Sequence, residues 1–336
     1  MTTAKLGRTG LVVNKDGFGA LPVQRVALPG AQTLLRAAFD AGIDFYDTAR
    51  MYTDSEEKLG HTFAGMRDKI VLATKTTAQT AQGFWQDLQT SLRLLQTDYV
   101  DIYQFHNPAF CPRPGDGTGL YEAMLQARDK GLIRFIGLTN HRLDVAREAA
   151  ESGLYDTIQY PFNYLATEGE KDLVQRCEAL DVGFIAMKGM SGGLIRNVAA
   201  SRAWLLQYPG AVPIWGIQRQ SELDALMEAM NGPEKPLGSY AEVIEADRAE
   251  LSGSFCRACG YCMPCPAGIE INSCARIMLW MRRAPGDFYT PEWRAKMEQV
   301  PGCLDCGQCK AKCPYGLDTP ALLRQNYAEY MENVPV

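Results

Sequence analysis

The 336-residue sequence predicts a closed (β/α)8 barrel, or TIM barrel, followed by a smaller helix-rich domain with clustered cysteines. Between Asp16 and Met230, short apolar runs alternate with longer amphipathic segments, a pattern typical of parallel strands wrapped by helices. Eight such units occur, and eight repeats favour a closed barrel over an open sheet. Eight of the eleven cysteines form two tight groups near the C-terminus, which indicates a separate metal-binding domain.

The eight predicted strands read as nearly continuous apolar runs, as expected for strands that are covered on both faces. They are residues 17–21, 43–47, 70–74, 100–105, 133–138, 157–160, 182–187 and 212–217. The pattern ends at Gly232, Pro233 and Pro236, and a polar helix is expected over residues 240–250. We therefore predict a barrel domain over residues 1–240 and a C-terminal domain over residues 241–336.

The overall charge and hydropathy exclude some classes of function. The net charge is -5, so no general basic field favours nucleic acid or anionic lipid. The first residues lack the apolar core of a signal peptide, and no stretch approaches the ~20 apolar residues that cross a bilayer. We expect a cytoplasmic protein that acts on small molecules and binds neither nucleic acid nor membrane; its oligomeric state is not indicated by the sequence.

Three of the predicted strands end in, or are directly followed by, ionisable side chains, namely Asp47, Lys75 and His106, and Tyr52 follows Asp47 by five positions. Because the carboxyl ends of barrel strands share one face, these side chains are expected to converge on one pocket. Such a set suits carbonyl reduction, in which Tyr52 protonates the alkoxide, Lys75 lowers the pKa of Tyr52 and Asp47 holds Lys75. His106 would hydrogen-bond the substrate oxygen.

A structural interpretation of the same residues is also possible. Asp47 could cap the following helix, Tyr52 could pack against that helix, Lys75 could be a solvated strand end and His106 a satisfied loop residue. This interpretation does not require the four side chains to share one face of the barrel. The catalytic interpretation does, and it is therefore the one that a structure can test.

The segments DFYDTARMYTDSEEKLG, VLATK and DIYQFH resemble the aldo/keto reductase family, and the resemblance covers the whole barrel. It is most specific for the members that carry a C-terminal ferredoxin-like extension. The resemblance implies a catalytic tetrad of Asp47, Tyr52, Lys75 and His106, and a nicotinamide cofactor. The residues that it places around that cofactor are Thr139, Asn140, Gln159, Met187, Gly216 and Arg219.

Several departures from the family concern the cofactor. Met187 stands where a tyrosine usually stacks on the nicotinamide ring, and Glu222 stands where an arginine is common. Arg219 is the only cation near Glu222 in the sequence. A carboxylate suits a ribose hydroxyl better than a 2'-phosphate, so NADH is as compatible with the sequence as NADPH. The turn at residues 191–193 offers backbone amides to a pyrophosphate, or is a plain turn.

The C-terminal cysteines have the spacing of iron–sulfur ligands. The second group, CLDCGQCKAKCP, is C-x2-C-x2-C-x3-C-P, the run that bacterial ferredoxins use for four-iron clusters, and the first group, CRACGYCMPCP, is one residue shorter. Zinc is the alternative, but it usually takes two separated C-x-x-C pairs. The sequence thus predicts a ferredoxin-like domain with two 4Fe-4S clusters. The candidate ligands are Cys256, Cys259, Cys262, Cys265, Cys303, Cys306, Cys309 and Cys313.

By resemblance to two-cluster ferredoxins, each cluster takes its fourth ligand from the other group: Cys313 joins the first three cysteines, and Cys265 joins those of the second group. Cys177 and Cys274 are expected in the core, and Cys111 is expected to be a spare thiol. Between the groups, residues 273–283 are expected to form one apolar helix.

Two functions remain open at this point. The first is an oxidoreductase that acts on a small carbonyl/alcohol substrate with NAD(P)H, while its clusters exchange electrons with a partner such as a ferredoxin or flavodoxin. The second is an iron–sulfur electron-transfer protein whose barrel is a docking or sensing module without nicotinamide chemistry. The complete tetrad favours the first, whereas Met187 and Glu222 leave room for the second.

Overall fold

A computed structural model describes residues 2–233, 235–251, 255–282 and 287–333. The chain divides into two compact units. The first comprises Met1–Met190 and Asn197–Ile244, and the second comprises Ser191–Arg196 and Glu245–Val336. Each unit is described by itself.

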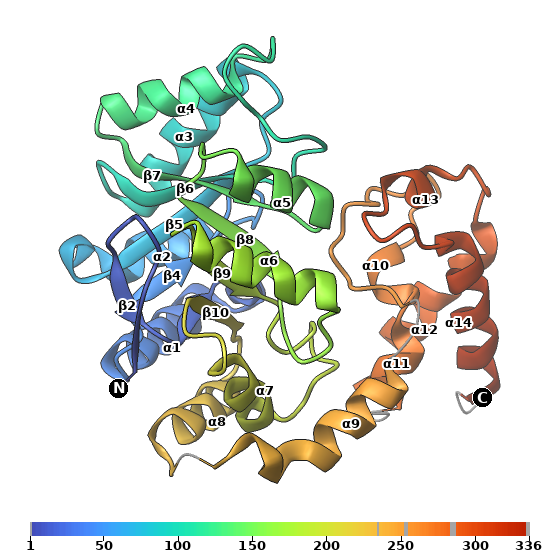
Figure 1. Ribbon diagram of the computed structural model, residues 1–336. Coiled ribbons are helices and arrows are strands. Elements are labelled where there is room, and N and C mark those ends of the chain that lie inside the picture. The colour runs from blue at the N-terminus through green and yellow to red at the C-terminus, as the bar shows by residue number, and fades with distance from the viewer. Residues whose placement is uncertain (1, 234, 252–254, 283–286, 334–336) are drawn as a thin grey trace. The chain divides into compact units, whose positions relative to one another are not determined.

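Eight parallel strands close the barrel of the first unit (Figure 1). Their order around the barrel is β10-β3-β4-β5-β6-β7-β8-β9. The strands are β3 (Gly17–Gly19), β4 (Phe45–Asp47), β5 (Val71–Thr76), β6 (Val100–His106), β7 (Ile133–Thr139), β8 (Thr157–Pro161), β9 (Gly183–Met187) and β10 (Ala211–Gly216). Each lies where the sequence predicts a strand, with ends shifted by no more than two residues. The predicted closed barrel is confirmed.

Helices follow the barrel strands and cover them on the outside (Figure 1). They are α1 (Leu28–Asp40), α2 (Ser55–Phe63), α3 (Ala81–Leu95), α4 (Leu120–Asp129), α5 (Leu143–Glu151), α6 (Glu168–Ala179), α7 (Val198–Leu205) and α8 (Gln220–Asn231). Several of them, among them α3, α6 and α7, begin with a side-chain cap. The Thr167 hydroxyl accepts a hydrogen bond from the Glu170 amide while Glu170 accepts one from the Thr167 amide, which forms a capping box at the start of α6.

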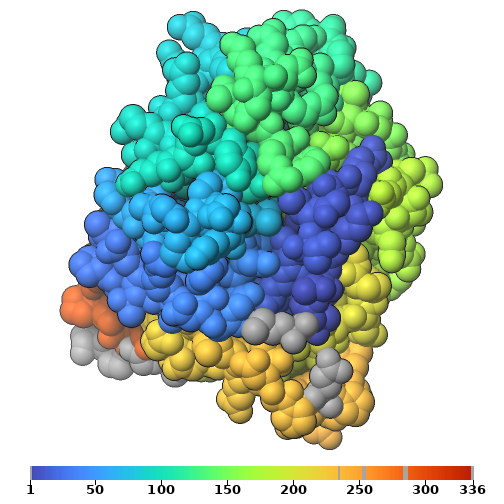
Figure 2. Space-filling model, turned by 90° about the vertical axis from the view of Figure 1, so that its left-hand side faces the viewer, coloured from blue at the N-terminus to red at the C-terminus, as the bar shows by residue number. Residues whose placement is uncertain are grey.

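A short hairpin that the sequence did not reveal closes the amino-terminal end of the barrel. Its strands, β1 (Thr3–Lys5) and β2 (Val12–Asn14), pair antiparallel, and Leu6 and Val13 pack in one core cluster with side chains of five barrel strands. In Figure 2 the dark-blue N-terminal segment fills the surface between the light-blue and yellow-green parts of the first unit. The hairpin therefore covers the amino-terminal end of the barrel.

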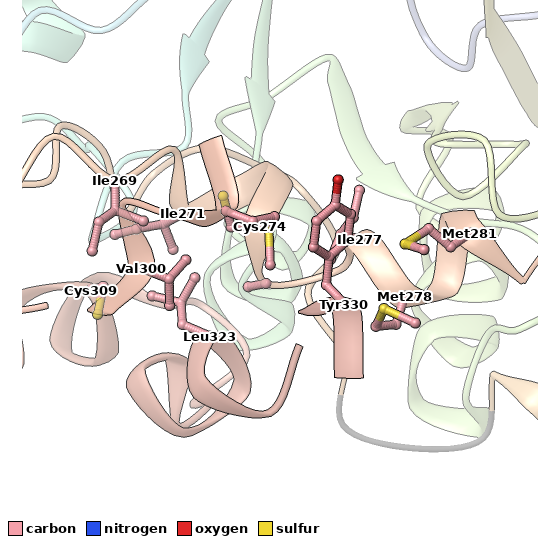
Figure 3. Close-up of a cluster of buried hydrophobic side chains, with 12 residues drawn as sticks. Ile269, Ile271, Cys274, Ile277, Met278, Met281, Val300, Cys309, Leu323 and Tyr330 are labelled. Atoms are coloured by element: carbon pink, nitrogen blue, oxygen red, sulfur yellow. The ribbon is translucent and has the colours of Figure 1, made fainter. Parts of the chain in front are cut away.

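The second unit is helical, as predicted. Helix α9 (Ala241–Glu250) leads into it, and the remaining helices are α10 (Ile271–Cys274), α11 (Ile277–Met281), α12 (Pro291–Met297), α13 (Gln308–Lys312) and α14 (Thr319–Asn333). Figure 3 shows its core, where aliphatic side chains and Tyr330 gather beside Cys309 and Cys274. The described residues contain no helix with the length and apolar character that a membrane crossing requires.

The single apolar helix expected over residues 273–283 is wrong. Two short helices, α10 and α11, replace it, and residue 283 lies outside the described residues. The break falls at Arg276, whose φ of -140° is not helical. Its buried guanidinium donates to the Ser191 and Gly192 carbonyl oxygens, at 3.1 and 3.2 Å, within the second unit. The chain leaves the helix because this contact fixes Arg276.

Candidate active site and cluster region

The predicted tetrad residues come together at the carboxyl ends of neighbouring strands. Asp47 ends β4, Lys75 is the penultimate residue of β5, and His106 ends β6. Tyr52 lies in the loop between β4 and α2 and is half-buried. The strands are paired in parallel, which brings these ends to one rim of the barrel. The geometric condition of the catalytic interpretation is met.

The contacts among the four side chains are direct. The Lys75 ammonium donates to Asp47 Oδ1 at 2.5 Å and to the Thr48 carbonyl oxygen at 2.6 Å. The same Nζ lies 5.3 Å from the centre of the Tyr52 ring, and the Tyr52 and His106 ring centres are 5.7 Å apart with the rings nearly perpendicular. Asp47 is bound to Lys75, and α2 begins after Asp54 instead, so Asp47 is not a helix cap.

Burial dominates the electrostatics of the site. It lowers the pKa of Lys75 and raises that of Asp47, while the attraction between the two opposes both changes. Burial, followed by the Lys75 charge, holds the pKa of His106 well below 6.5, so the imidazole is neutral at physiological pH. Burial and the Asp47 charge raise the pKa of Tyr52. Lys75 was expected to lower the pKa of Tyr52, but burial and Asp47 outweigh any such effect and the net direction is upward.

Two glutamines complete the surroundings of Asp47. Gln159 of β8 donates from Nε2 to Asp47 Oδ1 at 3.3 Å, and Gln104 of β6 donates to Asp47 Oδ2 at 3.1 Å. Gln104 also donates to Gln159 Oε1 at 2.8 Å. Sequence reasoning selected Gln159 only as a cofactor residue and missed Gln104. The signal available for Gln104 is its position two residues before His106, on the same face of one strand.

The other residues expected near the nicotinamide end β7 and β9. Thr139 is buried at the end of β7, and its hydroxyl points to the Met187 sulfur at 3.9 Å. Asn140 follows; its amide donates to the Pro108 carbonyl oxygen and accepts from the Arg142 amide. These contacts join the loops after β6 and β7. Asn140 is therefore held in place by the protein itself.

The residues expected near the adenosine half lie around the end of β10 and the start of α8. Gly216 and Arg219 are exposed. The Glu222 carboxylate accepts hydrogen bonds from the Gln218 and Arg219 amides, at 2.8 and 3.2 Å, and so caps α8. A negative charge thus occupies the helix terminus, where an anion would otherwise be favoured. The capping role was not predicted, although a glutamate three residues into a helix is its usual signal.

The turn at Ser191, Gly192 and Gly193 has three successive residues with positive φ, of 49°, 65° and 87°. Such a backbone is easy for glycine and unusual for serine. The turn belongs to the second unit, where Arg276 binds two of its carbonyl oxygens. The Ser191 and Gly192 carbonyl oxygens are therefore hydrogen-bonded within the second unit.

Cysteines of both groups surround one cavity in the second unit. Its lining includes Cys303, Cys306 and Cys309 of the second group together with Cys262 and Cys265 of the first. Most of the other lining residues are apolar, among them Ile269, Ile271 and Leu323. Within the described part of the chain, no three His, Cys, Asp or Glu side chains are arranged around a single metal ion. A hollow with several thiols and apolar walls fits a multi-iron cluster.

The three cysteines outside the two groups are all buried. The predicted core positions of Cys177 and Cys274 are confirmed. Cys111 is also buried, in the loop after β6 beside Pro112, whose carbonyl oxygen accepts a hydrogen bond from Tyr155. Cys111, expected as a spare thiol, is thus enclosed in the core, and burial raises the pKa of its thiol.

Comparison with known proteins identifies both units. Residues 17–202 match the aldo/keto reductase family. The chain belongs to this family. Residues 255–318 match a 4Fe-4S dicluster domain, so an iron–sulfur domain and an aldo/keto reductase barrel are joined in one oxidoreductase.

Similar proteins are known for the barrel. The aldo-keto reductase YhdN of Bacillus subtilis is 25% identical over 295 residues, which cover 68% of this chain and 88% of YhdN. L-galactose dehydrogenase of Arabidopsis thaliana is 31% identical over 209 residues, or 56% of this chain and 66% of that enzyme. A solved aldo-keto reductase of Klebsiella pneumoniae, in complex with NADPH, is 23% identical with a TM-score of 0.63, over 74% of this chain and 95% of the other.

Proposed function

We propose that this aldo/keto reductase reduces or oxidises a small carbonyl/alcohol substrate at Asp47, Tyr52, Lys75 and His106, with NAD(P)H as hydride carrier. The observation that carries the proposal is the contact of all four side chains at one rim of the barrel. A nicotinamide supplies or accepts the hydride when bound. Thr139, Asn140 and Gln159 would hold its carboxamide, with Met187 beside the ring.

The role of each tetrad residue follows from its surroundings. Tyr52 keeps its proton at physiological pH because its pKa is raised, and the alkoxide that forms on hydride addition is basic enough to take that proton. The Lys75 ammonium, 5.3 Å from the ring centre, then stabilises the phenolate. Neutral His106 orients the substrate oxygen beside Tyr52. Alcohol oxidation uses the same groups in reverse.

The eight clustered cysteines would hold two 4Fe-4S clusters, which supply one-electron transfer when bound. In the exchange of fourth ligands, Cys265 would join Cys303, Cys306 and Cys309, and Cys313 would serve the other cluster. Cys265 lines the same cavity as those three cysteines, which agrees with this assignment, and Cys262 of the first group lines it as well.

A redox partner such as a ferredoxin or flavodoxin would exchange electrons with these clusters. Within the second unit, Cys306 is exposed and the neighbouring Leu304 is 66% exposed. An exposed ligand and an exposed apolar side chain give a small electron carrier close access to a cluster.

The two cofactor forms remain alternatives. Glu222 places a carboxylate at the start of α8, which favours a ribose hydroxyl and therefore NADH. Arg219, exposed at the same helix terminus, is the cation that a 2'-phosphate would use.

The test is a calorimetric titration of anaerobically purified, cluster-loaded protein with NADH and with NADPH. Saturable binding of at least one of them is expected. Absence of binding by both would overturn the proposal and favour the second candidate, an iron–sulfur electron-transfer protein whose barrel is a docking module.

A further inference from the structure

The buried side-chain amide of Gln104 lies between Asp47 of the tetrad and Gln159, one of the residues expected to bind the cofactor. Gln104, on β6, is 0% exposed and contacts both Asp47 and Gln159. We propose that Gln104 is a positioning residue that holds the Asp47 carboxylate and the Gln159 amide in one fixed arrangement. This inference rests on the proposed function. It assigns to Gln104 the link between the tetrad residue Asp47 and the cofactor residue Gln159.

The geometry uses both amide hydrogens of Gln104. Nε2 donates to Asp47 Oδ2 at 3.1 Å and to Gln159 Oε1 at 2.8 Å. Gln159 closes the triangle by donating from its own Nε2 to Asp47 Oδ1 at 3.3 Å. A side chain needs two N–H donors on one nitrogen to satisfy both acceptors in this way. Neither an aliphatic side chain nor a carboxylate can replace it.

The hydrogen-bond partners of Gln104 distinguish the two possible orientations of its amide, which exchange Nε2 and Oε1. Gln104 Oε1 is buried and has no hydrogen-bond partner among the described residues. An unsatisfied buried acceptor is unfavourable. Reversing the amide would place this oxygen against two other acceptors, Asp47 Oδ2 and Gln159 Oε1, which is worse. The barrel tolerates the unpaired oxygen because the donors are needed on the other side.

The barrel also makes room for this side chain. Gln104 is the register partner of Lys75 on one side and of Gly137, in β7, on the other. A Cβ at Gly137 would lie only 2.8 Å from Gln104 Cγ and 2.5 Å from Thr157 Oγ1. A methyl group there would therefore displace Gln104 from its present position.

Two separate consequences follow. Hydrogen bonds to the ionised carboxylate hold down the pKa of Asp47 against burial, so loss of the Gln104 donor raises this pKa further. The titratable groups that face Asp47 are Lys75 of β5 and Tyr52 of the β4–α2 loop, with His106 of β6 beside Tyr52, and the substitution alters none of the three. Loss of the donor also frees Gln159 to rotate away from a nicotinamide carboxamide.

The test uses Gln104→Met, which keeps the length of the side chain and removes its amide, in cluster-loaded protein. Calorimetry measures the affinity for NADH or NADPH, whichever binds, and for ADP-ribose, which lacks nicotinamide. We expect nicotinamide affinity to fall by about tenfold, as for one hydrogen bond, and ADP-ribose affinity to stay within about twofold. The acid limb of the pH profile of kcat/KM is expected to move to higher pH.

The exposed Gln126→Met in α4 is the matched control and should change neither affinity nor the pH profile. Gly137→Ala displaces Gln104 without altering its chemistry, and should reproduce both effects if Gln104→Met does not fold. Unchanged nicotinamide affinity relative to ADP-ribose, with an unmoved acid limb, would overturn the role of Gln104. If the unaltered protein binds neither ligand, the proposed function itself fails.

Discussion

Replacing Lys75 by methionine tests the ion pair at the centre of the candidate site. Lys75 is 0% exposed and Asp47 2% exposed, and their charged atoms are 2.5 Å apart. Removing one partner of a buried pair leaves the other charge uncompensated, which typically costs about 3–5 kcal/mol of unfolding free energy. Asp47 would keep its bonds from Gln104 and Gln159, so we expect a loss near the lower end, about 3 kcal/mol at pH 7.

The loss should depend on pH with a definite sign. Without Lys75, the pKa of Asp47 in the folded protein rises further above its unfolded value, because burial already raises it. A group with a raised folded pKa takes up a proton on folding, so the variant recovers stability relative to the unaltered protein as the pH falls from 7 towards about 4. The recovery is at most about 1.4 kcal/mol per pH unit.

Turnover should fall by about 10²-fold or more, because the phenolate of Tyr52 loses its stabilising cation. Lys15→Met is the matched control. Lys15 is 2% exposed, and its ammonium donates to the Tyr208 and Pro209 carbonyl oxygens at 2.7 and 2.9 Å, away from the tetrad. This variant should also lose stability but should keep turnover within about threefold of the unaltered protein.

Denaturant unfolding and steady-state kinetics on both variants provide the measurements. Near-normal turnover in Lys75→Met, or an equal loss in Lys15→Met, would refute the reasoning. If the unfolding free energy of Lys75→Met does not recover at low pH, Asp47 is not the charge that Lys75 compensates.

Three further predictions concern the clusters and His106. Anaerobically purified protein should contain the iron and sulfide of two four-iron clusters, and stoichiometric zinc with little sulfide would contradict this. Cys265→Ser should lose as much cluster as Cys309→Ser, whereas Cys274→Ser should keep both clusters. NAD(P)H alone should reduce the clusters slowly in anaerobic stopped-flow absorbance, and a reduced ferredoxin quickly, because a hydride carries two electrons and a cluster accepts one. Complete bleaching by nicotinamide at catalytic speed, without bound flavin, would exclude that view. The pH profile of kcat/KM should show no inflection near pH 6.5, since His106 stays neutral there; an inflection that His106→Gln abolishes would show the opposite.

The parts of the fold that the sequence predicts are those with a repeated physical pattern. Continuous apolar runs located all eight barrel strands, because both faces of each strand are buried. The hairpin of β1 and β2 escaped prediction because its strands have three residues each, too few for a periodicity. The expected helix over residues 273–283 failed for a different reason: a tertiary contact of Arg276 interrupts an otherwise apolar segment.

In the candidate site, too, some residues were predictable from the sequence and others were not. Its ionisable residues were predictable because strand ends in a barrel share one face, which is a consequence of topology. Gln104 was missed, because its place two residues before His106 is a weak signal until its two acceptors, Asp47 and Gln159, are seen next to it. The net rise in the pKa of Tyr52 was not predictable either, because the sequence shows charged neighbours but not the depth of burial.

The central claim is that the barrel performs hydride chemistry at Tyr52. The most direct test is a single-turnover measurement of NAD(P)H oxidation by a panel of small aldehydes and ketones, in cluster-loaded protein and in Tyr52→Phe. The account predicts oxidation that depends on the carbonyl compound, and a rate in Tyr52→Phe that is lower by about 10²-fold or more while the cofactor still binds. Equal rates in the two proteins would contradict it.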